Sequence, residues 1–505
     1  HKGHVYFSSA VLEEVFTYNP RFSRTKELLN YFPESDQARI AGVRTRAVRR
    51  LWAEVRIALL DPDGMILRTD KAYREWAAGF LRQMERFDSL DLGGLSDGQL
   101  VDEFRAMERA YLKHYRLIRY GMVTHSIGTN LILKRWLADW LGDRSGALYA
   151  KLISGLEDNK TIKTNIALAG LARSARGDER VLRALRTLSS REFLARLATD
   201  GDLGGFAREL GRFIDEYGHR SHTREIFFPR WRDDPSLVVD VVKSLADSTN
   251  LDLEELERRK RAERTAAEKD ILGRASRMKW GFARKMALKT VMGYAQTYLT
   301  FRENQRFYLD HQIARQRRLF LEFGRRFHER GVLADPTDVF FLSKEEVFAM
   351  AHGGDAKTIA APVGQRRRDF EAYKDVLPPK FLRGDHEFDD TVAVREGAVR
   401  ITGTSASPGI VTGTVRVVSS IEQVSELLEG EILVTSNTDP GWTAVFSKLG
   451  GLVTETGGIL SHGAVVSREY GIPAVTAVMG ATRMLRTGQR VTLDGNEGTI
   501  LIQEG

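Results

Sequence analysis

A glycine-rich turn followed by a histidine offers the clearest chemistry in the sequence. Gly457 and Gly458 permit a tight turn and a close approach of the backbone to a ligand. Ser461 is a good N-cap for a helix that starts at His462, and Gly471 stands where a helix-ending glycine belongs. His462 would then lie beside free backbone N–H groups at the positive end of a helix dipole, where anions bind. A neutral imidazole there could attack phosphorus and carry a phosphoryl group; the alternative is a histidine that only caps the helix.

Two arginines one helical turn apart could neutralise a phosphoryl group during its transfer. Arg302 and Arg306 share one face of a predicted helix, and two adjacent guanidinium groups can hold phosphoryl oxygens. Glu303 lies next to them and is a further candidate for substrate or phosphate binding. The alternative is a solvated basic stripe in which the arginines pair with Glu303 or Asp310.

Basic side chains also crowd residues 217–231. Transfer to a hydroxyl group benefits from a base that acts near neutral pH, and His219 or His222 could serve. A purely structural role and a metal-binding pair remain open, but no third ligand is obviously placed, so we predict no metal site. Three neighbouring arginines are candidates for binding substrate or phosphate: Arg220, Arg224 and Arg230.

The elements that position these residues change character along the chain. From about residue 35 to 375, apolar residues recur at three- and four-residue spacing, which predicts helix after helix. One stripe runs from Ile40 to Leu59, and another from Trp280 to about Phe327. His125 lies in such a stretch, where it either lines an acceptor pocket or is a satisfied histidine of the core.

The chain becomes rich in predicted strands after Pro379. Residues 383–390 are polar and look like a linker, and a sequence of strands separated by turn signals follows from about residue 400. We predict strands at residues 410–418, 432–434, 452–453, 491–493 and 499–502. The C-terminal hundred residues therefore form a compact α/β unit.

The stretch from Gly457 to Val475 closely resembles the signature of the phosphohistidine domain of PEP-utilising enzymes. Ser407-Pro408-Gly409 and the Thr-Asp-Pro-Gly-Trp string at 438–442 fit the same domain. The resemblance implies a β/α/β swivel domain in which His462 is the phosphorylated histidine. Leu460 replaces the threonine of the dikinases, and His-Gly replaces His-Ala; both are more similar to the rifampicin phosphotransferase group.

The helical half is similar to the acceptor-binding domain of rifampicin phosphotransferase and of phenylphosphate synthase. Three strings carry this resemblance: residues 4–7, 217–231 and 301–306. We therefore expect a multidomain protein with a large, mostly α-helical N-terminal domain and a C-terminal α/β phosphohistidine swivel domain. The expected boundaries are 1–378 for a helical acceptor-substrate-binding domain, 379–396 for a linker or hinge, and 397–505 for the swivel domain.

In this family an ATP-grasp module phosphorylates the histidine. The helical half has no P-loop string and does not show the strands and glycine-rich loop that such a module needs, nor the alternating strands and helices of a TIM barrel. We therefore expect ATP and Mg²⁺ to bind a separate ATP-grasp subunit, unless the ATP module was cut away, and no cofactor to bind this chain tightly. The expected activity is a dikinase-type, ATP-dependent transfer to a phenol or alkylphenol hydroxyl. The alternatives are a rifampicin-type antibiotic phosphotransferase without its ATP-grasp domain and a PEP synthase-like phosphocarrier.

Composition limits the remaining classes of protein. The chain of 505 residues is 42% hydrophobic and lacks cysteine, which excludes disulfides and thiolate chemistry. Its formal net charge is +8, but the arginines alternate with acidic residues on helical patterns, so we expect no nucleic-acid partner. No apolar run is long enough to span a bilayer, and we expect no membrane partner and a cytoplasmic location.

Overall fold

A computed structural model gives the architecture of most of the chain. His222, Leu460 and most of the segments 4–7 and 379–396 lie outside the residues that it describes. The described residues are 6, 8–10, 13, 29, 32–42, 47–144, 146–221, 223–246, 252–373, 379, 381–384, 386–388, 400–418, 423, 427–438, 440–458 and 461–503.

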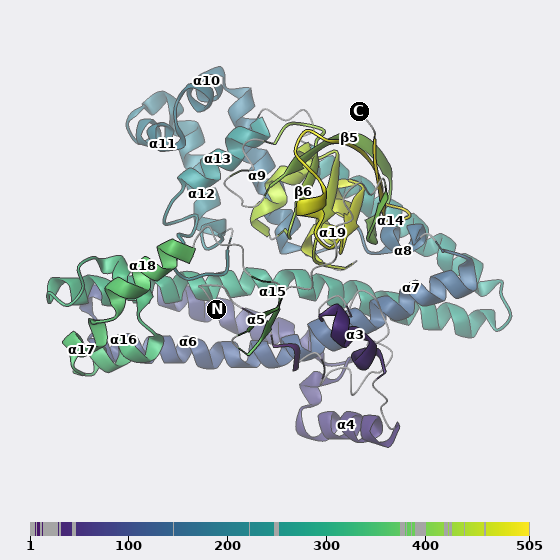
Figure 1. The fold of residues 1–505 in the computed structure, drawn as a ribbon, viewed down its shortest axis with the longest axis horizontal. Coiled ribbons are helices and arrows are strands. Elements are labelled where there is room, and N and C mark those ends of the chain that lie inside the picture. Colours follow the sequence, from purple (N-terminus) through teal and green to yellow (C-terminus); the bar gives the residue numbers. More distant parts are fainter. Residues whose placement is uncertain are drawn as a thin grey trace.

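The helical half is organised around one helix of 49 residues, α15 (Gly281–Glu329), which runs along most of the molecule in Figure 1. At a rise of 1.5 Å per residue this helix is about 74 Å long. Its apolar residues recur every three or four positions, so Tyr298 and Phe301 share one buried face. The helices α5 (Thr69–Asp88) and α6 (Asp97–Ile118) pack along that face and form the largest apolar core with it.

Further helices surround α15. Six of them lie between residues 127 and 217: α7 (Ile127–Leu141), α8 (Ala147–Leu152), α9 (Lys160–Gly177), α10 (Glu179–Thr187), α11 (Ser190–Thr199) and α12 (Gly204–Tyr217). The others are α3 (Glu34–Ala41), α4 (Ala47–Leu60), α13 (Ser236–Ala246), α14 (Leu253–Ser276), α16 (Lys344–Ala351), α17 (Ala356–Ala360) and α18 (Val363–Tyr373). A π-helical segment, η4 (Arg119–Ser126), joins α6 to α7.

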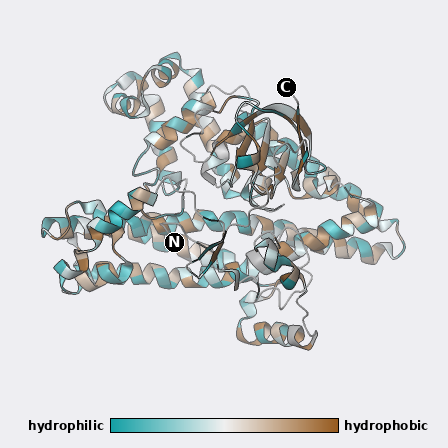
Figure 2. Cartoon of the chain, in the orientation of Figure 1, coloured by the Kyte–Doolittle hydropathy of each residue, from teal (hydrophilic) through white to brown (hydrophobic). Residues whose placement is uncertain are grey.

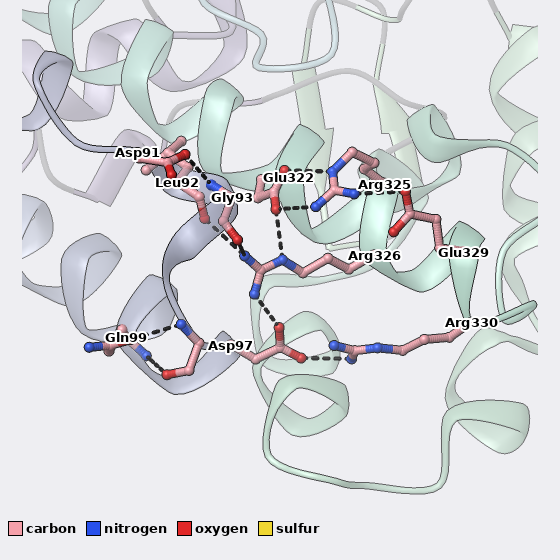
Figure 3. A network of polar contacts seen from close by, with 11 residues as sticks. Asp91, Leu92, Gly93, Asp97, Gln99, Glu322, Arg325, Arg326, Glu329 and Arg330 are labelled. Carbon is pink, nitrogen blue, oxygen red and sulfur yellow. Dashed lines mark hydrogen bonds and ion pairs between the residues drawn. The ribbon is translucent and has the colours of Figure 1, made fainter.

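An arginine network fixes the C-terminal end of α15 to the start of α6 (Figure 3). Arg326 donates to Asp97 at 2.8 Å, and Arg330 donates to the other oxygen of the same carboxylate at 2.7 Å. A second nitrogen of Arg326 donates to the carbonyl of Leu92 at 2.9 Å. Burial alone would raise the pKa of Asp97, but the hydrogen bonds from both arginines outweigh it and hold that pKa below its usual value. The network fixes the position of α15 along its own axis.

The C-terminal unit is an eight-stranded sheet in the order β3-β10-β9-β5-β6-β7-β8-β4. Strands β5 to β8 run parallel to one another, and the outer pairs are antiparallel. The bounds are β3 (Arg400–Thr402), β4 (Thr404–Ser407), β5 (Ile410–Val417), β6 (Ile432–Thr435), β7 (Gly451–Thr454), β8 (Ala474–Thr476), β9 (Arg490–Asp494) and β10 (Thr499–Ile502).

Both faces of this sheet are buried, because successive side chains of a strand point to opposite sides. On β6, Leu433 joins an apolar cluster beneath η8 (Pro440–Lys448) and α19 (His462–Tyr470), while Ile432 joins the cluster on the other face, which includes α20 (Ala481–Met484). All strands predicted from the sequence are present. The predicted fold class, a large helical region followed by an α/β unit, is confirmed.

Two sequence-based expectations differ from the structure. The apolar stripe from Ile40 to Leu59 does not form core along its length, because Leu51 and Leu59 on α4 are 66% and 74% exposed. The polar linker contains a short hairpin, in which β1 (Phe381–Arg383) pairs with β2 (His386–Phe388). A strand of three residues with charged side chains gives too weak a periodic pattern to be predicted.

The hydropathy of the chain follows this architecture. Figure 2 shows hydrophilic and hydrophobic residues alternating along the long helices, as expected for helices with one buried face. Within the described part of the chain, no helix combines the length and the apolar character needed to cross a membrane.

Candidate active site

The histidine turn forms as the sequence predicts. Helix α19 begins at His462, directly after Ser461, whose Oγ accepts a hydrogen bond from the N–H of Ala464 at 3.4 Å. The helix ends at Gly471, whose φ of 69° lies in the left-handed region that favours glycine. Gly457 has a φ of 106°, and a Cβ there would lie 2.9 Å from the Ser461 hydroxyl. His462 therefore lies in the first turn of a capped helix, at the carboxyl edge of the parallel strands, where ligands bind in many α/β folds.

The side chain of His462 faces α15 of the helical half. Its Nδ1 is 3.7 Å from Oε2 of Glu303, and both side chains are nearly buried, with 13% and 9% of their surface exposed. These residues are 159 positions apart in the sequence. The C-terminal unit therefore presents its phosphohistidine candidate directly to the helix that carries the predicted acceptor-site arginines.

The two arginines of that helix have different environments. Arg302 is partly exposed and, within the described residues, has no hydrogen-bond or ion-pair partner. Arg306 is 4% exposed and donates through Nε to Asp310 at 2.9 Å, and Asp310 is fully buried. The joint role of the two guanidinium groups in holding a phosphoryl group stays a prediction, with Arg306 engaged by a carboxylate and Arg302 not, in the described part of the chain. The alternative pairing with Asp310 occurs, but as a buried ion pair rather than on a solvated surface.

The segment 217–231 packs along the same helix. The ring of His219 stacks on that of His311 with centroids 3.5 Å apart, and it contacts the ring of Phe307 at 4.7 Å. Burial holds the pKa of His219 well below its ordinary value, and His311 and Arg220 act in the same direction, so the imidazole is neutral at neutral pH. Its Nε2 has no partner within the described residues. His222 lies outside the described residues.

The arginines of this segment differ in their burial and in their partners. Arg230 is 1% exposed and donates to the carbonyl groups of Thr223, at 2.9 Å, and of Glu225. Arg230 is thus held by two carbonyl groups of its own loop, and it also lines the cavity beside His219, so its role in phosphate binding stays a prediction. Arg220 is buried and Arg224 is exposed. Burial lowers the pKa of Arg230 to about 10, so it remains charged at neutral pH.

A small cavity of about 70 Å³ lies where this segment meets α15. His311 and Arg315 line it from α15, opposite His219 and Arg232. His311 was not predicted from the sequence, although its position four residues after Phe307 places both rings on one helical face. The cavity is lined by arginine, aspartate and histidine side chains and has the volume of one or two water molecules.

The structure supports the core role of His125. Its Nε2 lies 2.9 Å from the carbonyl oxygen of Gly64 and 3.2 Å from Oγ1 of Thr69. Burial lowers the pKa of His125 to about 4. A buried, neutral and hydrogen-bonded histidine stabilises the junction between η4 and α5 and does not need a ligand.

The π-helical segment η4 has a second contact that matters for the site. Gly121 lies against the ring of Phe301, and a Cβ at this glycine would come within 2.7 Å of two ring carbons. Phe301 precedes Arg302 on α15. Single π-helical turns inside helices are frequent at functional sites, and this one lets the backbone approach α15 closely.

We predict that Gly121→Ala lowers the free energy of unfolding by about 1 to 3 kcal/mol, because the added methyl group overpacks a filled core. The displaced Phe301 should also reduce phosphoryl transfer through Arg302. Chemical denaturation and a transfer assay of the same preparation check both effects. Gly170→Ala, a helical glycine with open space at the Cβ position, is the matched control; it should keep the wild-type transfer rate and unfold with a free energy no lower than wild type, because alanine favours the helix by about 1 kcal/mol.

A buried aromatic cluster beside this part of α15 was not predicted from the sequence. The ring of His114 stacks on Trp76 with centroids 4.4 Å apart and lies 4.3 Å from the ring of Tyr111. Tyr73 contacts Phe301 at 3.9 Å. Burial lowers the pKa of His114 to about 3, and both of its ring nitrogens lack partners in the described part of the chain. Aromatic residues recur every three or four positions on α5 and α6, and this spacing could have indicated the cluster. The same spacing is equally typical of residues in a hydrophobic core.

Polar atoms without partners gather near this cluster. Within the described residues they are the hydroxyl groups of Tyr73 and Tyr111, the nitrogens of His114, Nη2 of Arg306 and Oδ2 of Asp310. Asp310 and Arg306 both act electrostatically on Tyr111. An apolar wall with a few convergent polar atoms is the usual composition of a small-molecule site.

No group of three or more histidine, cysteine, aspartate or glutamate side chains is arranged to hold a metal ion within the described ranges.

Two known families match this chain. Residues 427–498, which include His462, match the family described as PEP-utilising enzyme, mobile domain. Residues 119–303, which end at Glu303, match the family described as rifampicin phosphotransferase fourth domain. These matches confirm the predicted resemblance to the PEP-utilising enzyme superfamily. The two matched regions meet in space at the contact between His462 and Glu303.

The curated relatives of this chain include several rifampicin phosphotransferases. The protein of Streptomyces sviceus is 30% identical over 416 residues, 79% of this chain and 46% of its own length. That of Bacillus subtilis is 28% identical over 75% of this chain and 44% of its own length. The prodigiosin synthesizing transferase PigC of Serratia marcescens is 28% identical over 84% of this chain and 48% of its length. The chain thus spans about half the length of these relatives.

One solved structure is also similar to this chain. A solution structure of Enzyme I is 16% identical, covers 51% of this chain and 83% of that chain, and has a TM-score of 0.17, which is too low to support an argument. The family matches and the relatives agree with the predicted resemblance to phosphotransferases. The relatives favour the rifampicin-type layout over that of phenylphosphate synthase.

Proposed function

We propose that this chain transfers a phosphoryl group through His462 to a hydroxyl group of an organic acceptor that binds on α15. The observation that carries the proposal is the position of His462, which faces Glu303 at 3.7 Å beside Arg302. A phosphoryl group on His462 in this position would lie directly beside the side chains that we propose to bind the acceptor. The donor that we propose is ATP with Mg²⁺, bound by an ATP-grasp module that His462 reaches when the swivel domain leaves α15.

In the proposed transfer, the bond between phosphorus and the His462 nitrogen breaks as a bond to the acceptor oxygen forms. Glu303 lies on the Nδ1 side of the imidazole, so it favours the tautomer that carries its proton there and leaves Nε2 to hold phosphorus. Arg302 lies one residue before Glu303 and can neutralise the phosphoryl oxygens. The acceptor proton passes to water or to a base on the acceptor's side of the phosphorus, opposite the Nδ1 side that Glu303 occupies.

Two observations bear on the class of acceptor. The rifampicin phosphotransferases among the relatives favour a large antibiotic with an aromatic portion. The cluster of Tyr73, Trp76, Tyr111 and His114 beside Arg306 favours an aromatic ring with a polar substituent. We therefore propose an acceptor with an aromatic group, with a rifampicin-type compound first and a phenol or alkylphenol second.

Running the reaction backwards tests this proposal without the ATP module. The purified chain is incubated with phosphorylated rifampicin, phenyl phosphate, an alkylphenyl phosphate or PEP, and an acid-labile phosphoryl group is sought by intact mass. We expect at least one of the aromatic donors to label the protein, and the one that does identifies the acceptor class. Labelling by PEP alone would support a phosphocarrier instead, and no labelling by any donor would contradict an acceptor site on α15.

A further inference from the structure

The interface between the swivel domain and the helical half contains a second buried carboxylate besides Glu303. Glu469 lies near the end of α19, is 5% exposed, and accepts a hydrogen bond through Oε2 from the backbone N–H of Gly155 at 2.8 Å. Gly155 lies between α8 and α9, 314 residues away in sequence. This bond therefore joins the two halves of the molecule, at the opposite end of the helix from His462.

The backbone conformation at Gly155 allows this hydrogen bond. Gly155 has a φ of 60°, in the left-handed region, and a Cβ there would lie 2.6 Å from the backbone nitrogen of Arg261 on α14. Only glycine fits this backbone conformation and this close approach without strain. The resulting turn aims a single N–H group at the carboxylate.

Apolar side chains of the same helix surround the bond. Val465 belongs to an apolar cluster formed mainly by α7, α8, α14 and α15, and Tyr470 packs against the cluster of α9 to α13. Glu469 thus lies between two apolar contacts and cannot be solvated while the swivel domain is docked. When the domain moves away to collect a phosphoryl group, this carboxylate must enter water and the N–H of Gly155 must lose its acceptor.

We propose that Glu469 is a positioning residue that sets the equilibrium between docked and undocked swivel domain. It acts through His462, because the bond to Gly155 and the contact with Glu303 form or break together at the two ends of one rigid helix. This inference goes beyond the proposed acceptor chemistry, since it concerns only whether the swivel domain rests on the helical half.

The charges that face this carboxyl group decide how pH acts on it. Burial raises the pKa of Glu469 to about 7, and Glu257 adds to this effect, whereas the Gly155 N–H acts against it. The charged groups around it are Arg468 from α19, and Glu257, Lys260 and Arg261 from α14, with Arg264 paired to Glu157 nearby. In water the pKa of a glutamate is about 4.3. The docked state therefore holds the proton more tightly, so docking is favoured at low pH and weakens as pH rises through about 7.

The absence of cysteine from the sequence allows a direct measurement of docking. Leu112→Cys on α6 and Ile410→Cys on β5 place one label on each half, at positions that are 63% exposed. Distances between the two labels in the full chain report the docked fraction without any phosphoryl transfer. We expect the docking equilibrium to fall about tenfold between about pH 6 and about pH 8.

Two variants in this labelled background test the role of Glu469. Glu469→Gln keeps an acceptor for the Gly155 N–H without a charge, and should remain docked with no dependence on pH. Glu469→Ala leaves that N–H without an acceptor, and should weaken docking about 5- to 30-fold at low pH. Glu497→Gln, an exposed glutamate of the same domain, is the control and should keep the wild-type pH dependence.

The proposal is overturned if Glu469→Gln retains the pH dependence of the control, or if Glu469→Ala docks as the wild type does. Circular dichroism of each variant checks that the fold is intact. Gly155→Ala perturbs the same hydrogen bond from the side of the helical half and is a second test of it. The docking measurement uses neither an acceptor nor a phosphoryl donor. A negative result in it therefore does not count against the proposed phosphoryl transfer, and a negative result in the transfer assay does not count against this inference.

Discussion

Replacing His462 by alanine will abolish phosphoryl labelling of the chain and all transfer to an acceptor. The imidazole is the group that forms the covalent bond to phosphorus, and no neighbouring side chain in the first turn of α19 can replace it. We expect loss of activity to the detection limit, a reduction of at least about 10⁴-fold. Intact-mass measurement of acid-labile phosphate checks the labelling, and an acceptor assay checks the transfer.

A matched control separates this effect from damage to the fold. His125→Asn removes another buried imidazole, which the structure assigns to the core, and should reduce stability while leaving the labelling site unchanged. If His462→Ala still acquires an acid-labile phosphoryl group, another histidine is the carrier and the assignment of α19 is wrong.

Arg302→Ala will slow transfer to the acceptor by about 10² to 10³-fold while His462 still becomes phosphorylated. The physical reason is that Arg302 has no partner within the described residues and lies beside Glu303, so its guanidinium group is available to the phosphoryl oxygens. A single-turnover assay from preloaded phosphohistidine measures this step alone. Arg302→Lys should recover part of the rate, because lysine supplies the charge without the fork of donors.

Arg306→Ala should behave differently, and the difference is informative. Its loss leaves Asp310 as an unpaired buried charge, which should cost about 3 to 5 kcal/mol of stability. Arg306→Ala with Asp310→Ala removes both charges and should recover much of that stability. If Arg302→Ala has no effect on transfer and the double variant abolishes it, the roles that we assign to these two arginines are reversed.

The local parts of this site were predictable from the sequence and the tertiary parts were not. Ser461, His462 and Gly471 define their helix through caps and a left-handed glycine, which depend only on neighbouring residues. The pairing of Arg306 with Asp310 was one of two open alternatives, because helical spacing brings both together but does not say whether they are buried. The contact between His462 and Glu303 joins two domains, and no periodicity within either domain encodes it.

The fold shows the same division. Strand β10 was predicted with the bounds that it has, because apolar residues and a strong turn signal surround it. The apolar residues of α4 are spaced as on a buried helix, yet most of them are exposed, because the periodic pattern shows an apolar face but not what covers it. The cluster around His114 was not predicted, because aromatic residues at helical spacing usually indicate only a hydrophobic core.

The central claim is that phospho-His462 delivers its phosphoryl group to an acceptor bound on α15, and a preloaded single turnover tests it most directly. The chain is phosphorylated chemically with phosphoramidate, freed of reagent, and mixed with rifampicin or with a phenol. Loss of phosphate from residue 462 and its appearance on the acceptor are then followed in the same quenched samples. We predict that both proceed with one rate constant, and that Arg302→Ala slows both together. If phosphate leaves His462 only to water, at a rate that the acceptors do not change, the account is contradicted.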